Sequence, residues 1–289
     1  MIALFQQNES LFLVSLFLIG ACVGSFLNVV IYRLPRSLQQ QWSRQCQELL
    51  EITATDSENT APGIAYPPSF CPSCKTPIKA WHNLPILGYI FLKGRCNSCN
   101  VKIPARYPVI ETFTALLTVF LGLKFGLEWK TLFALVLAWS LITLTFIDID
   151  HHLLPDNITL PLMWLGLIAN LNGIFTSLHS AVIGAIAGYM CLWILYQIHF
   201  RLTGKEGMGY GDFKLLAALG AWFGWSILAV VALIASLSGT IFAVWNMIFS
   251  GSGKNMPIAF GPFLALSGLV ILLWGDIIIE RYLTFFLLA

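Results

Sequence analysis

Charged residues are scarce in this sequence. Asp, Glu, Lys and Arg make up only 10% of its 289 residues, whereas 57% are hydrophobic. A soluble domain usually contains roughly 25% charged residues, so this scarcity excludes an ordinary soluble protein. We therefore expect an all-α polytopic membrane protein with about eight transmembrane helices of roughly 20 residues. The apolar runs that predict them are residues 11–31, 109–127, 131–147, 158–172, 180–200, 213–225, 227–249 and 258–275.

The first apolar run lacks the marks of a cleaved signal peptide. No basic residue precedes Leu11, and no A-x-A site closes the run before Tyr32. We therefore expect residues 1–31 to contain a retained first transmembrane helix.

Nucleotide-binding motifs are also missing. The chain has no GKS or GKT phosphate loop, and the glycines of GMGYGDFK at 207–214 do not follow a strand, as those of a dinucleotide fold would. No repeat of fixed period is present. The sequence gives no reason to expect a nucleotide site or a nucleic-acid partner.

The positions of the basic residues predict the topology. Nine of the 16 Lys and Arg residues lie between Arg33 and Arg106, and short loops rich in Lys and Arg stay in the cytoplasm. If that segment is cytoplasmic, 148–156, 201–214 and Lys254 are cytoplasmic as well. The loops near 124–130 and 172–179 are then outside, although Lys124 and Lys130 run against the rule.

Residues 32–107 form the only long polar stretch, and we expect a cytoplasmic domain there. Its first part, 38–62, reads as a short helix followed by a flexible linker. Its second part, about 63–107, is too small to bury an adequate core and needs a cross-link or a bound metal ion to stabilise it. The remaining segment, 108–289, is then the main transmembrane domain.

Two C-x-x-C pairs, CPSC and CNSC, lie in this small second part. Two such pairs complete the tetrahedral thiolate shell that zinc favours. A reducing cytoplasm argues against disulfides, and a redox dithiol is less favoured because two pairs are present without a thioredoxin-like pattern. Four protein ligands leave no open position on the metal, so we expect a structural zinc site formed by Cys71, Cys74, Cys96 and Cys99.

Ionisable residues at membrane depth are costly and therefore mark functional sites. The run IDIDHHLLPD at 147–156 carries Asp148, which ends an unbroken apolar helix. Asp156 follows a proline and reads as a helix N-cap, and Asp212 in GMGYGDFK also precedes a helix that it could cap. We expect a solvated loop at Asp150, His151 and His152, and metal binding by these residues is the alternative.

A cap does not require glycine at Gly207, Gly209 and Gly211, every second position before Asp212. Such a run lets another backbone approach closely. Two aspartates from different helices at one membrane depth are what an aspartic protease needs, because close carboxyls share a proton and supply an acid and a base. The residues alone thus predict a protease with Asp148 and Asp212 as its catalytic pair.

Several motifs resemble the type IV prepilin peptidases, a GxGD family of intramembrane aspartic proteases. The matching stretches are GSFLNVVIYRLP at 24–35, CPSC, CNSC, RYPVIE at 106–111, IDIDHHLLPD at 147–156 and GMGYGDFKLLAALGAW at 207–222; the tail after about residue 225 is unmatched. The resemblance implies that Asp148 and Asp212 catalyse cleavage of type IV prepilins and pseudopilins after a glycine that ends a basic leader. It also implies methylation of the new N-terminal amine with S-adenosylmethionine.

The resemblance further implies an inner-membrane enzyme of a type IV pilus or type II secretion system, with its active site facing the cytoplasm. The sequence shows no donor site of the Rossmann type, and the polar residues Asn28, Arg33 and Glu111 are our methylation candidates. Interfacial anchoring and helix-end hydrogen bonding would explain them equally well.

Two other functions remain open at this point. A proton- or metal-coupled transporter would use Asp148, Asp150, His151, His152 and Asp212, but the paired broken helices of two symmetric halves are not found. A zinc-bearing membrane scaffold would leave the glycine run and both boundary aspartates without a purpose.

Overall fold

The computed structural model describes residues 8–51, 63–64, 66–205, 207–249 and 259–287. These residues form helices and loops, with two isolated β-bridges and no named strand among them. The all-α prediction is confirmed. The chain divides into two compact units, Met1–Leu127 and Glu128–Ala289.

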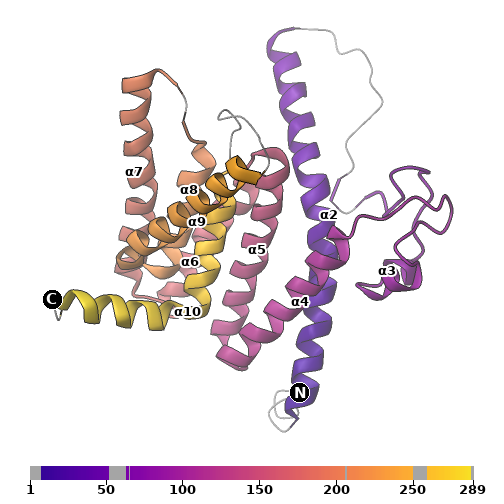
Figure 1. Ribbon diagram of the computed structural model, residues 1–289, viewed down its shortest axis with the longest axis horizontal. Coiled ribbons are helices and arrows are strands. Elements are labelled where there is room, and N and C mark those ends of the chain that lie inside the picture. The colour runs from indigo at the N-terminus through magenta and orange to yellow at the C-terminus, as the bar shows by residue number, and fades with distance from the viewer. Residues whose placement is uncertain (1–7, 52–62, 65, 206, 250–258, 288–289) are drawn as a thin grey trace. The chain divides into compact units, whose positions relative to one another are not determined.

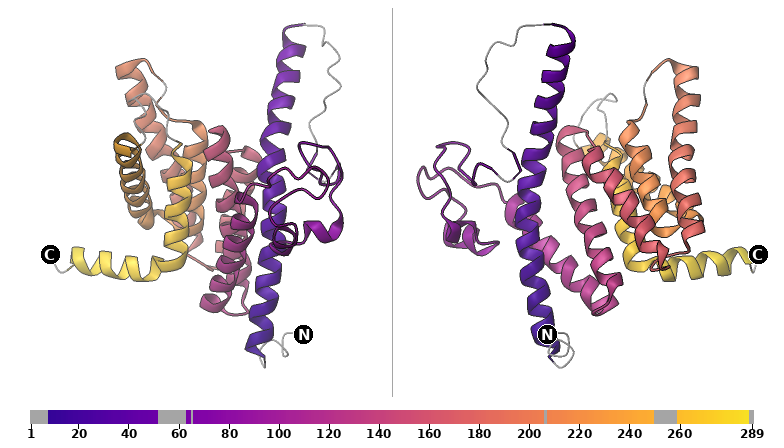
Figure 2. Two further views of the ribbon diagram at one scale, coloured as in Figure 1. Left: turned by 45° about the vertical axis from the view of Figure 1, so that its right-hand side comes forward. Right: turned by 180° about the vertical axis from the view of Figure 1, so that it is seen from behind.

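Unit 1 is built on two long helices, α2 (Glu9–Leu49) and α4 (Arg106–Phe125). They pack against each other, and the segment between them folds beside α2 with the short helices η1 (Ala80–Asn83) and α3 (Leu87–Phe91) (Figure 2). Glycines allow the close approach: a Cβ on Gly20 would lie 2.7 Å from the backbone of Ala115. α4, which the sequence placed in the segment 108–289, therefore belongs with α2 in this unit.

Helix α2 is longer than a membrane is thick. Its 41 residues correspond to about 60 Å at about 1.5 Å per residue, against a hydrocarbon core of about 30 Å. The helix runs through Pro35 to Leu49, so the separate short helix expected after residue 38 is its continuation. Good helix formers follow Pro35, and the buried Leu34 and Leu38 anchor this stretch. The linker expected at the end of 38–62 falls on 52–62, outside the described residues.

Unit 2 is a helical bundle arranged around one short, buried helix (Figure 1). That helix, α8 (Tyr210–Phe223), packs against α6 (Asp156–Leu171), α7 (Leu178–Thr203) and α10 (Gly261–Leu287), and α10 also packs against α5 (Trp129–His151). The remaining elements are η2 (Trp225–Ile227) and α9 (Leu228–Phe249). Helix α10 therefore connects the two helices that carry Asp148 and Asp212.

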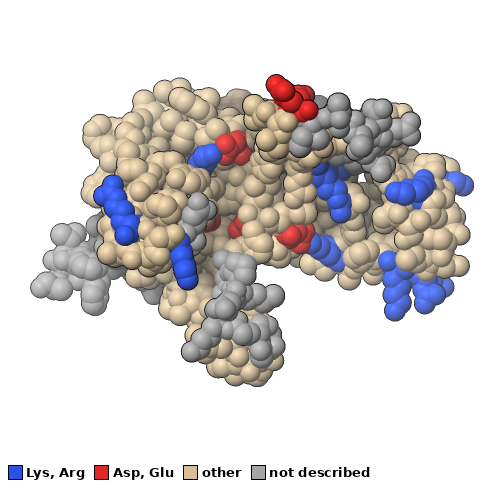
Figure 3. All heavy atoms as spheres, turned by 90° about the horizontal axis from the view of Figure 1, so that it is seen from above, with Lys and Arg blue, Asp and Glu red and all other residues tan. Residues whose placement is uncertain are grey.

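Six of the described helices are long and apolar enough to cross a membrane: Ser10–Leu49, Arg106–Phe125, Trp129–His151, Leu178–Thr203, Trp225–Phe249 and Gly261–Ile278. The predicted spans 158–172 and 213–225 form α6 and α8, which have only 16 and 14 residues. A straight span needs about 20. A multi-pass membrane protein is thus supported, whereas the count of eight spans is not confirmed. On the face drawn in Figure 3, Lys and Arg side chains are scattered among mostly uncharged residues, and Asp and Glu side chains are fewer.

Candidate functional site

Asp148 lies in the last turn of α5, just before the helix ends. The following His152 adopts a left-handed conformation with φ of 50°, and its amide donates 2.9 Å to the Asp148 carbonyl, which closes the helix. The Asp148 side chain is 5% exposed. A hydrogen bond from the Gly261 backbone amide reaches its carboxylate. Asp148 is therefore held at the end of an apolar helix by a backbone donor from another element.

Asp212 is the third residue of α8, and the N-cap position belongs to Gly209 rather than to Asp212. Its side chain is 8% exposed, and its Oδ1 is buried with no hydrogen-bond partner among the described residues. The Gly209 amide donates to the carboxylate, and the charge of Asp148 acts on it directly. The structure thus brings the two predicted aspartates into one buried carboxylate pair in unit 2.

Gly261 also lies next to the aspartate pair, and the sequence did not identify it as a site residue. It is the first residue of α10 and belongs to the tail for which no motif was matched. A Cβ there would lie 2.5 Å from Oδ2 of Asp148 and 3.1 Å from Cδ1 of Leu154. The only sequence signal was a glycine followed by proline at the start of an apolar run, which marks a helix start and not a site.

The three glycines before Asp212 differ in their surroundings. A Cβ on Gly207 would lie 2.8 Å from the His199 ring, and one on Gly211 would lie 2.7 Å from Cβ of Leu154. Gly209 is exposed, and Oδ2 of Asp212, at 3.9 Å, is the nearest atom to a Cβ built there. Gly211 is thus required for packing against Leu154, Gly207 lies against the exposed His199 ring, and Gly209 is the position open to an approaching backbone.

The other ionisable residues of the 147–156 run are placed differently. Asp150 and His152 are exposed and His151 is half-buried, so of the five residues that a transporter would use only the two aspartates of the pair are buried. α6 begins at Asp156 itself with Pro155 as its N-cap, so Asp156 is not the cap. Its carboxylate instead pairs with Lys214 Nζ at 2.6 Å, which ties the start of α6 to α8.

The four predicted zinc ligands meet in unit 1. Their Sγ atoms all lie within 4.8 Å of one another, with Cys71 and Cys99 3.8 Å apart and Cys74 and Cys96 4.0 Å apart. A tetrahedral zinc with bonds of about 2.3 Å places its sulfurs about 3.8 Å from each other, so the set fits the ion. The cluster is a candidate metal site, as predicted.

Each C-x-x-C pair sits in the same kind of turn. In the first, the Cys71 amide donates to Thr76 O at 3.0 Å, and Lys75 has a positive φ of 58°. In the second, the Cys96 amide donates to Val101 O at 2.9 Å, and Asn100 has a φ of 57°. The two turns present their sulfurs in matching ways, which is the geometry of paired metal knuckles.

Electrostatic interactions and hydrogen bonds shift the pKa values of the cysteine thiols. Hydrogen bonds with the Thr76 side chain and backbone lower the pKa of Cys74 to about 6. A backbone hydrogen bond with Val101 also acts to lower the pKa of Cys99, but burial and the neighbouring sulfurs Cys74 and Cys96 outweigh it and raise this pKa to about 12. Adjacent thiolates repel one another, and a bound dication removes that repulsion.

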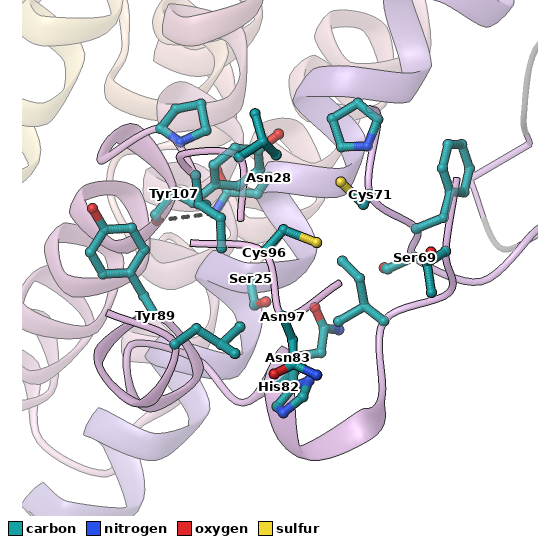
Figure 4. A pocket seen from close by; sticks show the side chains of 18 of the residues that line it. Ser25, Asn28, Ser69, Cys71, His82, Asn83, Tyr89, Cys96, Asn97 and Tyr107 are labelled. Carbon is teal, nitrogen blue, oxygen red and sulfur yellow. Dashed lines mark hydrogen bonds between the residues drawn. The ribbon is translucent and has the colours of Figure 1, made fainter. Parts of the chain in front are cut away.

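A cavity of about 420 Å³ lies beside the cysteine cluster within unit 1. All three methylation candidates, Asn28, Arg33 and Glu111, line it, and their side chains are 8%, 6% and 8% exposed. Asn28 Nδ2 donates to Tyr107 O at 3.2 Å, and Figure 4 shows this bond with Tyr89 on the same side of the cavity. The structure therefore gathers three polar residues from α2 and α4 at one cavity.

Glu111 also holds an unusual backbone in place. Its Oε2 accepts a hydrogen bond of 2.7 Å from the amide of Ile86. Ile86 has a φ of 62°, and a β-branched residue seldom adopts a positive φ. Backbone strain of this kind is concentrated at functional sites, where surrounding contacts hold it.

Comparisons with known proteins cover most of the chain. The bacterial peptidase A24 N-terminal domain matches residues 18–125, and the type IV leader peptidase family matches residues 135–244. No solved structure matches the chain.

Curated relatives are similar along nearly their whole length. A protein from Aeromonas hydrophila is 49% identical over 94% of this chain and 93% of its own, and one from Pseudomonas aeruginosa is 45% identical over 95% and 94%. A third, from Neisseria gonorrhoeae, is 48% identical over 89% of both chains. All three are called prepilin leader peptidase/N-methyltransferase. With this identity and coverage, and with a buried aspartate pair and a four-cysteine cluster at the motif positions, the chain belongs to the type IV leader peptidase family.

Proposed function

We propose that this protein is a membrane aspartic endopeptidase that removes the basic leader of type IV prepilins and pseudopilins after a glycine. It then methylates the new N-terminal amine with S-adenosylmethionine. The names of the curated relatives support both activities, and no finding supports the transport alternative.

The observation that carries the peptidase assignment is the buried pair of Asp148 and Asp212. Two neighbouring carboxyls in a poorly solvated site do not both ionise easily, so one retains a proton. The ionised member takes a proton from water as the water oxygen attacks the scissile carbonyl carbon. The protonated member donates its proton to the carbonyl oxygen, which gives a tetrahedral intermediate. As the C–N bond breaks, the proton taken from water passes to the departing amine nitrogen, and a hydroxyl of the intermediate returns a proton to the other carboxylate.

The proposed substrate suits a site at the membrane edge. A prepilin leader is basic and is followed by an apolar helix, so the leader stays in the cytoplasm while the helix enters the bilayer. The bond to be cut then lies at the inner boundary, next to the end of α5 and the start of α8. Gly209, exposed beside the Asp212 carboxylate, leaves room for the backbone around the substrate glycine.

We also propose roles for the cysteine cluster and the two domains, and a location for the enzyme. The cysteine cluster holds a structural zinc ion that orders residues 63–107, within a cytoplasmic domain of residues 32–107 that follows a first transmembrane helix in 1–31. Residues 108–289 contain the protease. The enzyme lies in the bacterial inner membrane, with its active site facing the cytoplasm, and serves a pilus or type II secretion apparatus.

A cleavage assay with the purified protein and a prepilin tests the peptidase. Asp148→Asn and Asp212→Asn each remove one titrating carboxyl while keeping its size, and we expect each to lower the cleavage rate by about 10³-fold or more, since acid–base catalysis alone contributes about 10²–10⁴-fold. Rates are read from the leader-sized shift in substrate mobility.

Asp150→Asn is the matched control, because Asp150 belongs to the same run but is exposed. It should cleave at nearly the normal rate. Cleavage that persists in either variant of the pair would disprove the proposed catalytic role.

A further inference from the structure

The peptidase mechanism makes no use of the cavity in unit 1. It is formed by α2, by the segment of residues 69–104 that carries the four cysteines (the cysteine module), and by the first turns of α4. Its volume of about 420 Å³ falls within the range of small-molecule sites. Five aromatic side chains are among the residues that line it: Tyr32, Phe70, His82, Tyr89 and Tyr107. Aromatic side chains can stack on a flat heterocycle.

Glu111 places a carboxylate in this cavity without a cationic partner. Its interactions are with the Ile86 amide, at 2.7 Å, and with the Ser25 side chain. Among the described residues no Lys or Arg pairs with it. A buried carboxylate without a counter-charge is costly, so the site is suited to a ligand that brings a positive charge.

Arg33 places the opposite charge in the same cavity. Its Nη1 donates to the carbonyls of Gly63 and Ile64, at 2.9 and 3.4 Å, and within the described part of the chain it pairs with no carboxylate. A guanidinium has five donors in a planar fork, and two carbonyl contacts leave donors for a carboxylate ligand. The cavity thus offers one anion and one cation that do not neutralise each other.

We propose that this cavity binds S-adenosylmethionine, with Glu111 facing the sulfonium charge and Arg33 facing the methionyl carboxylate. The donor has three groups that match this lining: a cationic sulfur for the carboxylate, a carboxylate for the guanidinium, and an aromatic base for the aromatic side chains. Asn28 hydrogen-bonds to the first turn of α4 and keeps this wall in position. The assignment rests on the proposed methyl transfer and specifies where in the chain the donor is bound.

Comparing two ligands isolates the role of Glu111. S-adenosylmethionine carries the sulfonium charge, whereas S-adenosylhomocysteine lacks the transferred methyl group, has a neutral sulfur and keeps the other groups. Affinities are measured by calorimetric titration of the purified full-length protein. Glu111→Gln should weaken binding of S-adenosylmethionine by about tenfold or more and binding of S-adenosylhomocysteine by less than about threefold. The reason is that only S-adenosylmethionine loses a charge–charge attraction. An equal loss for both ligands, or no loss, would overturn the assignment.

Glu48→Gln is the matched control, since Glu48 is exposed on α2 in the same unit. It should bind both ligands as the unaltered protein does. The glutamine at position 111 retains an acceptor for the Ile86 amide, and thermal unfolding checks that the variant is folded.

Photocrosslinking of radiolabelled S-adenosylmethionine to the unaltered protein tests the site without any substitution. Peptide mapping should place the label within residues 25–36 or 69–111, and a label in unit 2 would refute the proposal. The two hypotheses fail differently. If the unaltered protein does not methylate a cleaved prepilin, the proposed function fails; if it methylates but the label lies elsewhere, only the donor site fails.

Discussion

At the scale of single residues, Gly261 illustrates how a residue without a side chain controls a carboxylate. Its amide donates to Asp148, and the missing Cβ leaves the space that Oδ2 of Asp148 occupies. Leu154, buried 3.1 Å from the Cβ position of Gly261, also contacts Gly211, the residue before Asp212. The carboxylate pair is thus positioned by two close approaches that larger residues would prevent.

Gly261→Ala should therefore impair cleavage although no catalytic atom is removed. The added methyl group has to displace the Asp148 carboxylate, and misplacing a reacting group by about 1 Å can cost about 10²-fold in rate. We expect kcat for prepilin cleavage to fall by about tenfold or more, with KM much less affected. Steady-state kinetics measures both.

The control for this substitution is Gly275→Ala on the same helix. The nearest side-chain atom to a Cβ at Gly275 is Cγ2 of Ile271 at 3.3 Å, so a methyl group is accommodated with a small shift. Near-normal kcat in the Gly261 variant would mean that this contact does not position Asp148 for catalysis.

At the scale of elements, the cysteine module takes its order from paired turns. Unit 1 has no β-sheet among its described residues. The module has two isolated bridges instead, Phe70 to Pro77 before η1 and Arg95 to Lys102 between α3 and α4. Each bridge lies beside one C-x-x-C turn. A metal that joins the two turns would supply the staple that so small a module requires.

Removal of one sulfur ligand should therefore affect both metal content and stability. We expect about one zinc ion per chain in the purified protein, as a four-cysteine site holds one ion. Cys71→Ser should lose most of this zinc and unfold at a temperature several degrees lower, because metal binding contributes directly to folding free energy. Elemental analysis and thermal unfolding measure the two effects.

Cys46→Ser is the comparison, since Cys46 is exposed on α2 outside the cluster. It should keep its zinc. Full zinc content in the Cys71 variant would argue against the proposed ligand set.

At the scale of the whole molecule, the aspartate pair constrains the membrane topology of unit 2. Asp148 lies at the end of α5 and Asp212 at the start of α8, and their interaction requires both ends to be on the same side. We therefore expect the intervening α6 and α7 to cross the membrane and return. α6 has only 16 residues, about 24 Å at about 1.5 Å per residue, so in this topology it would cross as an unusually short helix.

Reporter insertions can test this topology. Alkaline phosphatase is active only outside the cytoplasm, so an insertion after Gly126 should be active and one after Gly204 inactive, as the distribution of Lys and Arg also predicts. A fluorescent protein that matures only in the cytoplasm should give the reverse pattern. If phosphatase is active after Gly204, α6 does not cross and the two aspartates do not share one face of the membrane.

Features that depend on local composition and spacing could be predicted from the amino-acid sequence. Apolar runs predict membrane helices because helix length and burial in lipid are properties of one segment, and two C-x-x-C pairs predict a thiolate cluster because each pair chelates from its own turn. The aspartates stood out as ionisable residues at the ends of apolar runs. Each of these features could be predicted without knowing which segments lie next to one another in the folded protein.

Contacts between segments that are distant in the sequence became visible only in the folded structure. Gly261 gives no local signal of its contact with Asp148, and nothing in the spacing of Asn28, Arg33 and Glu111 predicts a common cavity. The separate roles of Gly207, Gly209 and Gly211 likewise depend on what packs against each. Such contacts arise from packing between helices, and their geometry is set by the shapes of both partners rather than by either sequence segment alone.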